Sequence, residues 1–282
     1  MRFAPLLLLA VVAAPALAQD LPAVPVPKWE AKFVGIETTP LAVEKPRLMK
    51  GHAVRIDLTA DGISFLATPP MADKPTLTAG LKTSTFLEKH RCQLAINAGP
   101  FGPVKNDEGF EATVSGPHVS NGKLVSKGAK YDALFIAKDN AAAVQSPPFK
   151  LDDAHTVVGG FSVVLKGGKL PELIADFNKG PLHPRTAAGV SKDGKTLILL
   201  VIDGRQKEFS DGATVGEVGL WLKALGAADG INLDGGGTTT LVVADDQGKA
   251  SVINKPIHLG KPGTERPSGS HLGVFAKPLS AK

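Results

Sequence analysis

Residues 231–240, Ile-Asn-Leu-Asp-Gly-Gly-Gly-Thr-Thr-Thr, place amide, carboxylate and hydroxyl side chains beside a flexible backbone. Side chains alternate along a strand, so Asn232 and Asp234 are predicted to face one way while Ile231 and Leu233 enter the core. The glycines that follow allow positive φ and let backbone N–H groups approach a ligand closely. The stretch therefore predicts a site for a ligand that carries an anionic group beside a bond to be broken.

A plain β-hairpin is the alternative interpretation of this stretch, because Asp-Gly between two apolar runs is a strong turn signal. A two-residue turn needs only one or two glycines. A third glycine adds to the conformational entropy that the backbone loses on folding and contributes nothing to the turn. A Walker-type phosphate loop is excluded, because it needs Gly-Lys-Ser/Thr at the start of a helix. Here residues 241–243, Leu-Val-Val, continue as β structure.

Four further polar residues stand where predicted strands begin or end. Arg185 precedes a strand and could form two parallel hydrogen bonds to a phosphate, with a surface arginine as the alternative. Asp203 and Arg205 follow a buried strand, where a rigid scaffold offers side chains to a ligand, although a simple turn fits equally. Asn97 ends another strand, and an Asx-type turn is its alternative role.

Apolar patterns predict the strands that position these residues. Residues 53–58 alternate apolar and polar side chains, which is typical of a half-buried strand. Residues 93–97 form a second strand that stops at a Gly-Pro loop. The apolar run 196–203 predicts a central strand that is buried on both faces.

Two helices are expected beside these strands. A short one covers residues 83–90, and a clearer one begins after Thr214, where Glu217 completes a capping box, and ends at Gly226. No change of composition separates the parts. The predicted fold class is α+β, a sheet-dominated mixed domain with many hairpins and a few packed helices, formed by residues 49–282 as one domain.

Residues 1–18 have the features of a signal peptide. Arg2 supplies the positive start, an apolar core follows, and residues 16–18, Ala-Leu-Ala, form a cleavage signal. The apolar run is too short to span a bilayer comfortably. We expect a periplasmic or secreted bacterial protein without stable membrane insertion after cleavage, and an extended, proline-rich lead-in over residues 19–48.

The composition bounds the remaining choices. The chain has 282 residues, of which 43% are hydrophobic, with 31 Gly and 22 Pro, so it can bury a large core built from short strands. The net charge of +5 falls to about +4 when Arg2 is removed with the signal peptide. No basic run interleaved with aromatic residues is present, so nucleic acid is not a predicted partner.

Cysteine and histidine usage predicts no cofactor. Cys92 is the single cysteine, which excludes an internal disulfide and favours a buried, inert thiol. The seven histidines lack the spacing of known metal motifs, so each is interpreted as a surface or core residue. We predict no metal site and no cofactor, with a divalent metal kept as an alternative.

Several motifs together resemble the phosphodiester glycosidase family. Residues 232–239, NLDGGGTT, resemble the family motif NLDGGGS-S/T, and residues 184–190, PRTAAGV, resemble PRTAIGV. Residues 201–205, VIDGR, resemble VVDGR, and residues 95–101, AINAGPF, resemble INGGFF. Two more landmarks match, one from Gly159-Gly160-Phe161 to Gly168-Lys169 and one from Arg266-Pro267 to Phe275. The resemblance covers residues 53–277 in order.

The resemblance implies hydrolysis of a sugar-1-phosphodiester, small or polymeric, at the bond between the anomeric carbon and oxygen. Free sugar and a phosphomonoester would be released. Asp234 would stabilise positive charge on the sugar, Asp203 would activate water or orient Arg205, and Arg185 would clamp the phosphate. The expected substrate- and phosphate-binding residues are Asn97, Thr186, Arg205, Asn232, Gly235, Gly236, Gly237, Thr238, Thr239 and Arg266.

Two other functions are compatible with the same residues. One is a metal-dependent phosphodiesterase that breaks the phosphorus–oxygen bond with a metal held by Asp203 and Asp234. The other is a non-catalytic protein that binds anionic envelope glycans. The sequence leaves open the sugar, the aglycone, the stereochemical course and the oligomeric state.

Overall fold

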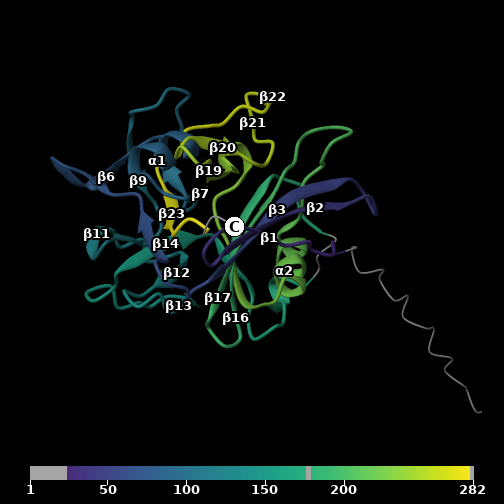
Figure 1. The fold of residues 1–282 in the computed structure, drawn as a ribbon, viewed down its shortest axis with the longest axis horizontal. Helices are drawn as coiled ribbons and strands as arrows, with labels where there is room; N and C mark the ends of the chain where they lie inside the picture. The colour runs from purple at the N-terminus through teal and green to yellow at the C-terminus, as the bar shows by residue number, and fades with distance from the viewer. Residues whose placement is uncertain (1–23, 176–178, 280–282) are drawn as a thin grey trace, which may run out of the picture.

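A computed structural model of the chain describes residues 24–175 and 179–279, so the expected signal peptide lies outside the described residues. The described part is dominated by strands and contains two α-helices, α1 (Thr83–His90) and α2 (Val215–Ala224). These helices lie on opposite sides of the molecule (Figure 1). The expectation of a sheet-dominated fold with few helices is confirmed, and the helical share is small.

The largest sheet has seven strands in which every neighbouring pair is antiparallel. Its order is β1 (Glu30–Phe33), β2 (Ile36–Val43), β3 (Met49–Asp57), β17 (Thr196–Ile202), β16 (Arg185–Ser191), β18 (Ala227–Asn232) and β15 (Ser162–Leu165). Strands β1 and β2 lie within the stretch expected as a lead-in. Their pairing makes residues 30–43 part of the sheet, which therefore begins before residue 49.

Four smaller sheets complete the fold. One five-stranded sheet contains β11 (Lys123–Ser126), β10 (His118–Ser120), β14 (Thr156–Gly160), β12 (Asp132–Ile136) and β13 (Ala142–Gln145). A second contains β20 (Ala250–Val252), β19 (Leu241–Ala244), β7 (Leu94–Asn97), β23 (His271–Phe275) and β4 (Ser64–Ala67). The others join β5 (Pro70–Met71), β6 (Lys74–Ala79), β9 (Glu111–Val114) and β8 (Phe101–Gly102), and β21 (Ile257–His258) with β22 (Lys261–Pro262). Single 3-10 turns, η1 (Glu172–Ile174) and η2 (Gly236–Thr238), interrupt the loops.

Strand β17 is central and buried on both faces, as its apolar run predicts. Leu197, Leu199 and Val201 point into the core shared with the two five-stranded sheets. Ile198 and Leu200 alternate with these residues along the strand and point to the opposite face, which α2 covers. Because side chains alternate along a strand, two covered faces require apolar residues at every position.

Helix α2 begins at the predicted capping box. Thr214 Oγ1 accepts a hydrogen bond from the Glu217 N–H at 3.2 Å, and the Thr214 N–H donates to Glu217 Oε2 at 2.8 Å. Trp221 is fully buried against the sheet, and Gly226 ends the turn with a φ of +105°. The helix packs on β15, β16 and β18, and so it supports the strand that leads into the glycine stretch.

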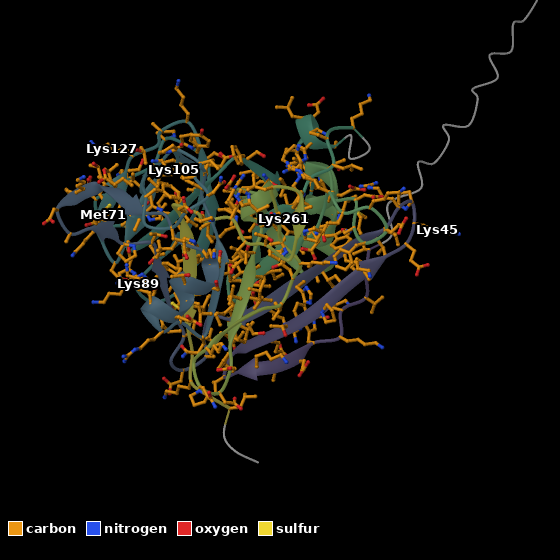
Figure 2. All side chains as sticks on the ribbon, turned by 90° about the horizontal axis from the view of Figure 1, so that it is seen from above. Lys45, Met71, Lys89, Lys105, Lys127 and Lys261 are labelled. Atoms are coloured by element: carbon orange, nitrogen blue, oxygen red, sulfur yellow. The ribbon has the colours of Figure 1, made fainter. Side chains whose placement is uncertain are left out.

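The surface carries dispersed basic residues. Lys45 lies at one end of the molecule, Lys89, Lys105 and Lys127 lie toward the other end, and Lys261 lies between them (Figure 2). Within the described ranges, no helix is long and apolar enough to cross a membrane.

Two buried histidines, the half-buried His52 and the buried cysteine have pKa values that favour their uncharged forms. Burial lowers the pKa of His52 to about 4, of His118 to about 4 and of His271 to about 3. His118 Nε2 lies 2.8 Å from the Thr68 carbonyl oxygen, and the His271 ring stacks on Phe86. Burial also raises the pKa of the Cys92 thiol to about 12, which agrees with the predicted inert thiol.

These histidines predict loss of stability in acid. Their pKa values are depressed in the folded state, so below pH 6.5 the unfolded chain binds protons that the folded chain excludes. The free energy of unfolding should fall from pH 6.5 toward pH 4, by up to about 1.4 kcal/mol per pH unit for each histidine. Urea denaturation at a series of pH values measures this slope.

His271→Asn should reduce that slope, and His155→Asn, at a half-buried histidine, is the matched control. Equal free energies of unfolding at pH 6.5 and pH 4.5 in the unmodified protein would contradict this assignment.

Candidate active site

The ends of three strands and one loop meet at a junction between two sheets. Because β16 runs antiparallel to β17 and β18, its first residue lies beside their last ones, with Arg185 opposite Ile202 and Ala187 opposite Asn232. The Asp234 N–H then donates to the Ala98 carbonyl at 2.8 Å, which joins the loop after β18 to the end of β7. Residues far apart in the chain are brought together at this junction.

Asn97, which is fully buried, holds the junction together through both ends of its side-chain amide. Its Nδ2 donates to the Asp234 carbonyl oxygen at 2.6 Å and to Thr238 Oγ1 at 3.3 Å. Its Oδ1 accepts from Thr186 Oγ1 at 2.8 Å and from the Thr240 N–H at 3.2 Å. These bonds identify Asn97 as a residue that positions the glycine loop.

The glycine stretch connects two sheets and is not a hairpin, which removes the simple-turn interpretation. It follows β18 of the seven-stranded sheet, forms η2, and enters β19, which pairs with β7 and β20. Gly236 has a φ of +69°, and a Cβ there would lie 3.3 Å from the Arg205 guanidinium. A Cβ on Gly237 would lie 3.1 Å from Arg266 Nη1. The glycines thus leave room for two arginine side chains to lie against the loop.

A cavity of about 440 Å³ opens beside this loop. The predicted residues Arg185, Arg205, Asn232, Asp234 and Arg266 line it together with the three glycines. The remaining lining residues are Phe161, Ser162, His183, Pro184, Val215 and Leu233. One carboxylate and three guanidinium groups therefore share a single hollow.

The arginines are held in place by the surrounding backbone and side chains. Arg185 donates from Nε to the Ala213 carbonyl oxygen and from Nη2 to the Pro181 carbonyl oxygen, both at 2.9 Å. Arg205 Nη2 lies 3.2 Å from His183 Nδ1. Burial and the nearby Arg205 lower the pKa of Arg185, because positive charges are crowded here. Such a crowd of cations favours binding of an anion.

Asp234 provides the carboxylate of the cavity. Its Oδ2 accepts a hydrogen bond from Thr238 Oγ1 at 2.8 Å. Burial raises the pKa of Asp234, while Thr238 and the positive charge of Arg266 act in the opposite direction. The side chain is therefore fixed in orientation, and its charged form is supported by a hydroxyl donor and a neighbouring cation.

The structure does not bring Asp203 to the cavity. This buried carboxylate accepts from Asn254 Nδ2 at 2.8 Å and from the Lys255 N–H at 3.0 Å, and burial raises its pKa. Asn254 Nδ2 also donates to the Thr239 carbonyl oxygen at 3.1 Å. The arrangement favours a positioning role, in which Asp203 fixes the chain that leaves the glycine loop.

Thr186, Thr238 and Thr239 also support the loop from outside the cavity lining. Thr186 Oγ1 lies 3.4 Å from Thr239 Oγ1, and all three residues are buried. Their hydroxyls belong to the hydrogen-bond network around Asn97 and Asp234.

His183 and Phe161 are among the lining residues that the sequence reasoning did not single out. His183 directly precedes the Pro-Arg-Thr motif, and Phe161 belongs to the Gly-Gly-Phe landmark. The position of each residue next to or within a motif could therefore have identified it. Their contribution to the cavity depends on strand pairing that brings β15 and β16 onto either side of β18.

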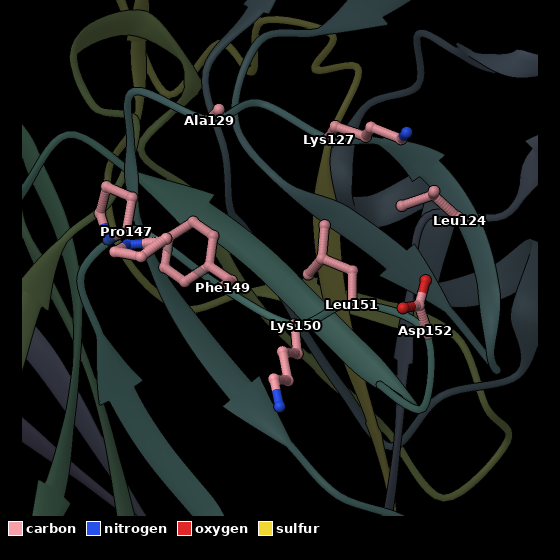
Figure 3. Close-up of a pocket in the computed structure, with 9 residues that line it drawn as sticks. Leu124, Lys127, Ala129, Pro147, Phe149, Lys150, Leu151 and Asp152 are labelled. Atoms are coloured by element: carbon pink, nitrogen blue, oxygen red, sulfur yellow. The ribbon is translucent and has the colours of Figure 1, made fainter.

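A second concavity, of about 520 Å³, lies on another part of the molecule and differs in character. Apolar residues such as Leu124, Phe149 and Leu151 dominate its lining, with Lys127 and Lys150 at its sides (Figure 3). Its lining contains the carboxylate of Asp152 but no arginine, so this concavity is a weaker candidate for hydrolytic chemistry.

The described acidic, histidine and cysteine side chains lie too far apart to form a metal site. Over residues 24–175 and 179–279, no three of them gather in a geometry that could hold a metal ion. Asp203 and Asp234, the pair expected to hold a metal in the phosphodiesterase alternative, have separate surroundings, since Asp203 bonds to Asn254 and Asp234 to Thr238.

The fold and the cavity bring three arginines and one carboxylate together at a junction of antiparallel sheets. Residues 90–275, more than half of the chain, match the model of the phosphodiester glycosidase family. The chain therefore belongs to the phosphodiester glycosidase family. No curated protein matches the sequence.

Solved structures share the fold at low sequence identity. The catalytic domain of zebrafish N-acetylglucosamine-1-phosphodiester alpha-N-acetylglucosaminidase, auto-inhibited by its pro-peptide, is similar with a TM-score of 0.64 and 20% identity. The match covers 90% of this chain and 87% of that one. A Burkholderia pseudomallei K96243 protein, provisionally described as exported, has a TM-score of 0.62 and 15% identity over 80% of this chain and 74% of its own.

The hydrogen bonds of Asn97 predict an effect on protein stability that can be measured independently of any catalytic activity. Asn97→Ala should lower the free energy of unfolding by about 1–3 kcal/mol, because it leaves the buried partners of the amide without hydrogen bonds. Chemical denaturation measures the change, and Gln247→Ala, at an exposed residue, is the control. An unchanged denaturation midpoint would show that Asn97 does not hold the junction.

Proposed function

We propose that this protein is an exported hydrolase that cleaves the bond between the anomeric carbon and oxygen of a sugar-1-phosphodiester. The observation that carries the proposal is the shared cavity, in which Asp234 and three arginines face one space beside the glycine loop. Membership of the phosphodiester glycosidase family supports the same reaction class. The signal-peptide features of residues 1–18 support export to the bacterial periplasm or medium.

In the proposed reaction, water oxygen bonds to the anomeric carbon as the bond from that carbon to the phosphate oxygen breaks. The electron pair leaves with the phosphate, and the water proton passes to the phosphomonoester or to solvent. A phosphate monoester is a weakly basic leaving group, so it needs electrostatic stabilisation more than a strong general acid. The arginines supply that stabilisation at fixed positions.

Arg185 is proposed to hold the departing phosphate. Two of its donors are already bonded to backbone carbonyl oxygens, which fixes the guanidinium plane before substrate arrives. Arg205 and Arg266 add positive charge beside Gly236 and Gly237 of the glycine loop. Charge that is pre-organised in this way needs little rearrangement when the leaving group becomes anionic.

Asp234 is proposed to face the sugar. Positive charge develops on the anomeric carbon and ring oxygen in the transition state, and a nearby carboxylate stabilises it. The hydrogen bond from Thr238 orients the carboxylate of Asp234, which lines the cavity. Asp203, Asn97, Thr186, Thr238 and Thr239 are proposed to position this machinery, and no cofactor is invoked in the proposed chemistry.

The position of bond cleavage tests the reaction. Glycosyl phosphodiesters should be hydrolysed in water labelled with heavy oxygen, and the products analysed by mass spectrometry. Label in the released sugar supports the proposal. Label in the phosphomonoester would instead establish phosphorus–oxygen cleavage, and ligand binding without product under any metal condition would establish a non-catalytic glycan-binding protein.

Asp234→Asn should abolish most turnover while the protein stays folded, because the substitution removes the negative charge and keeps the side-chain shape. Initial rates with the best glycosyl phosphodiester measure the effect, and circular dichroism checks the fold. Asp246→Asn, at an exposed carboxylate nearby in the sequence, is the matched control. A near-normal rate for the Asp234 variant would contradict its assigned role.

Arg185→Ala should lower kcat/KM by about 10²–10³-fold, the size expected when one pre-organised group is lost from a transition-state clamp. Arg185→Lys should recover only part of the loss, because an ammonium cannot reproduce the forked guanidinium donors. Steady-state kinetics separates kcat from KM. If both constants are unchanged in the alanine variant, the phosphate is held elsewhere.

A further inference from the structure

We propose that Phe161 is the platform on which the sugar ring of the substrate lies, and that it determines specificity for the glycosyl group. This inference rests on the proposed function. Phe161 is the single residue between β14 of one five-stranded sheet and β15 of the seven-stranded sheet. The glycine loop leaves the same seven-stranded sheet for the other five-stranded sheet, and Phe161 and the loop line one cavity.

The backbone of Phe161 is fixed relative to the strand that leads to Asp234. Its N–H donates to the Asn232 carbonyl oxygen at 2.8 Å, and Ser162 lies opposite Asn232 in the β15–β18 pair. Gly160 permits this close approach, because a Cβ there would lie 2.7 Å from the same carbonyl oxygen. The Gly-Gly-Phe sequence thus fixes the Phe161 backbone against Asn232, the last residue of β18, two residues before Asp234.

The ring of Phe161 is supported from one side and open on another. Tyr131 contacts it in a T-shaped arrangement, with 6.0 Å between ring centroids and 64° between planes. Even so, 50% of Phe161 is exposed, and the residue lines the cavity. An apolar ring kept accessible at a cavity rich in charge has a free hydrocarbon surface for a ligand.

A sugar ring matches this surface. One face of a pyranose ring presents C–H groups, while its edge carries hydroxyls, so it can lie on a phenyl ring and still meet polar groups. Among the described residues that line the cavity, Phe161 alone carries a phenyl ring, and Ser162 and Asn232 beside it are polar.

The positions of the charged groups orient the substrate. The phosphate is attracted to Arg185, Arg205 and Arg266. A sugar joined to that phosphate, with its anomeric carbon near Asp234, then extends toward the side of β18 that carries Phe161. The geometry thereby places the glycosyl group on the aromatic side of the cavity and leaves the aglycone beyond the arginines.

Ligand binding tests the platform without requiring turnover. Saturation-transfer NMR would be recorded with D-glucose, D-galactose, D-mannose and N-acetyl-D-glucosamine, and calorimetry with inorganic phosphate and glycerol phosphate. In the unmodified protein, at least one sugar should receive most saturation at the C–H protons of one ring face. Phe161→Leu should weaken that sugar by about three- to tenfold, the range given by the loss of one aromatic contact.

Two further variants sharpen the comparison. Phe161→Tyr keeps the aromatic ring and should retain the sugar signals. Phe149→Leu makes the same change as Phe161→Leu in the apolar groove of Figure 3 and should leave sugar binding unaffected. Phosphate affinity should be unchanged in all three variants, which also shows that the arginine side of the cavity is intact.

The outcomes separate this inference from the reaction itself. Sugar signals that are absent from the unmodified protein, or unchanged in Phe161→Leu, overturn the platform. A selective loss of glycerol phosphate affinity in Phe161→Leu would assign the ring to the aglycone and also overturn it. The label experiment is independent, since sugar can bind on Phe161 even if the bond broken is phosphorus–oxygen.

Discussion

The buried side-chain amide of Asn97 is the interaction on which the candidate site depends. It has two donors and an acceptor with two lone pairs, and the structure uses both ends of it across three segments of chain. The glycine loop has little regular structure of its own, being one 3-10 turn between two strands. Its shape is therefore imposed by hydrogen bonds from the ends of neighbouring strands, with Asp203 and Asn254 fixing the segment that follows.

Crowded positive charge is the second constraint. Three arginines beside one aspartate repel one another, and burial lowers the pKa of Arg185 and of Arg266. The backbone carbonyl oxygens that accept from Arg185 offset part of this cost, and the Asp234 carboxylate acts against the lowering of the Arg266 pKa. An anionic ligand would relieve the remaining repulsion, so the folded state carries an electrostatic preference for one.

The arrangement of sheets explains how such a site can be both rigid and open. Strand β17 has apolar side chains on both faces, and the layers on either side of it hold the seven-stranded sheet in place. At the ends of β15, β16 and β18, polar side chains such as Ser162, Arg185 and Asn232 line the cavity and leave the apolar core. Phe161 occupies such an end, which is why a large apolar side chain remains accessible there.

Local patterns in the sequence determined the elements. The alternation in residues 53–58, the apolar run of β17 and the Thr214–Glu217 capping box predicted strands and a helix that the structure contains, because these signals act over a few residues. The motifs around Arg185, Asp234 and Arg266 also indicated which residues meet in the cavity. Tertiary structure alone decided that Asp203 faces Asn254 and not the cavity, that residues 30–43 join the sheet, and that Phe161 lines the site. The physical reason is that strand pairing between distant segments sets where a side chain at a strand end points, and no local pattern encodes that pairing.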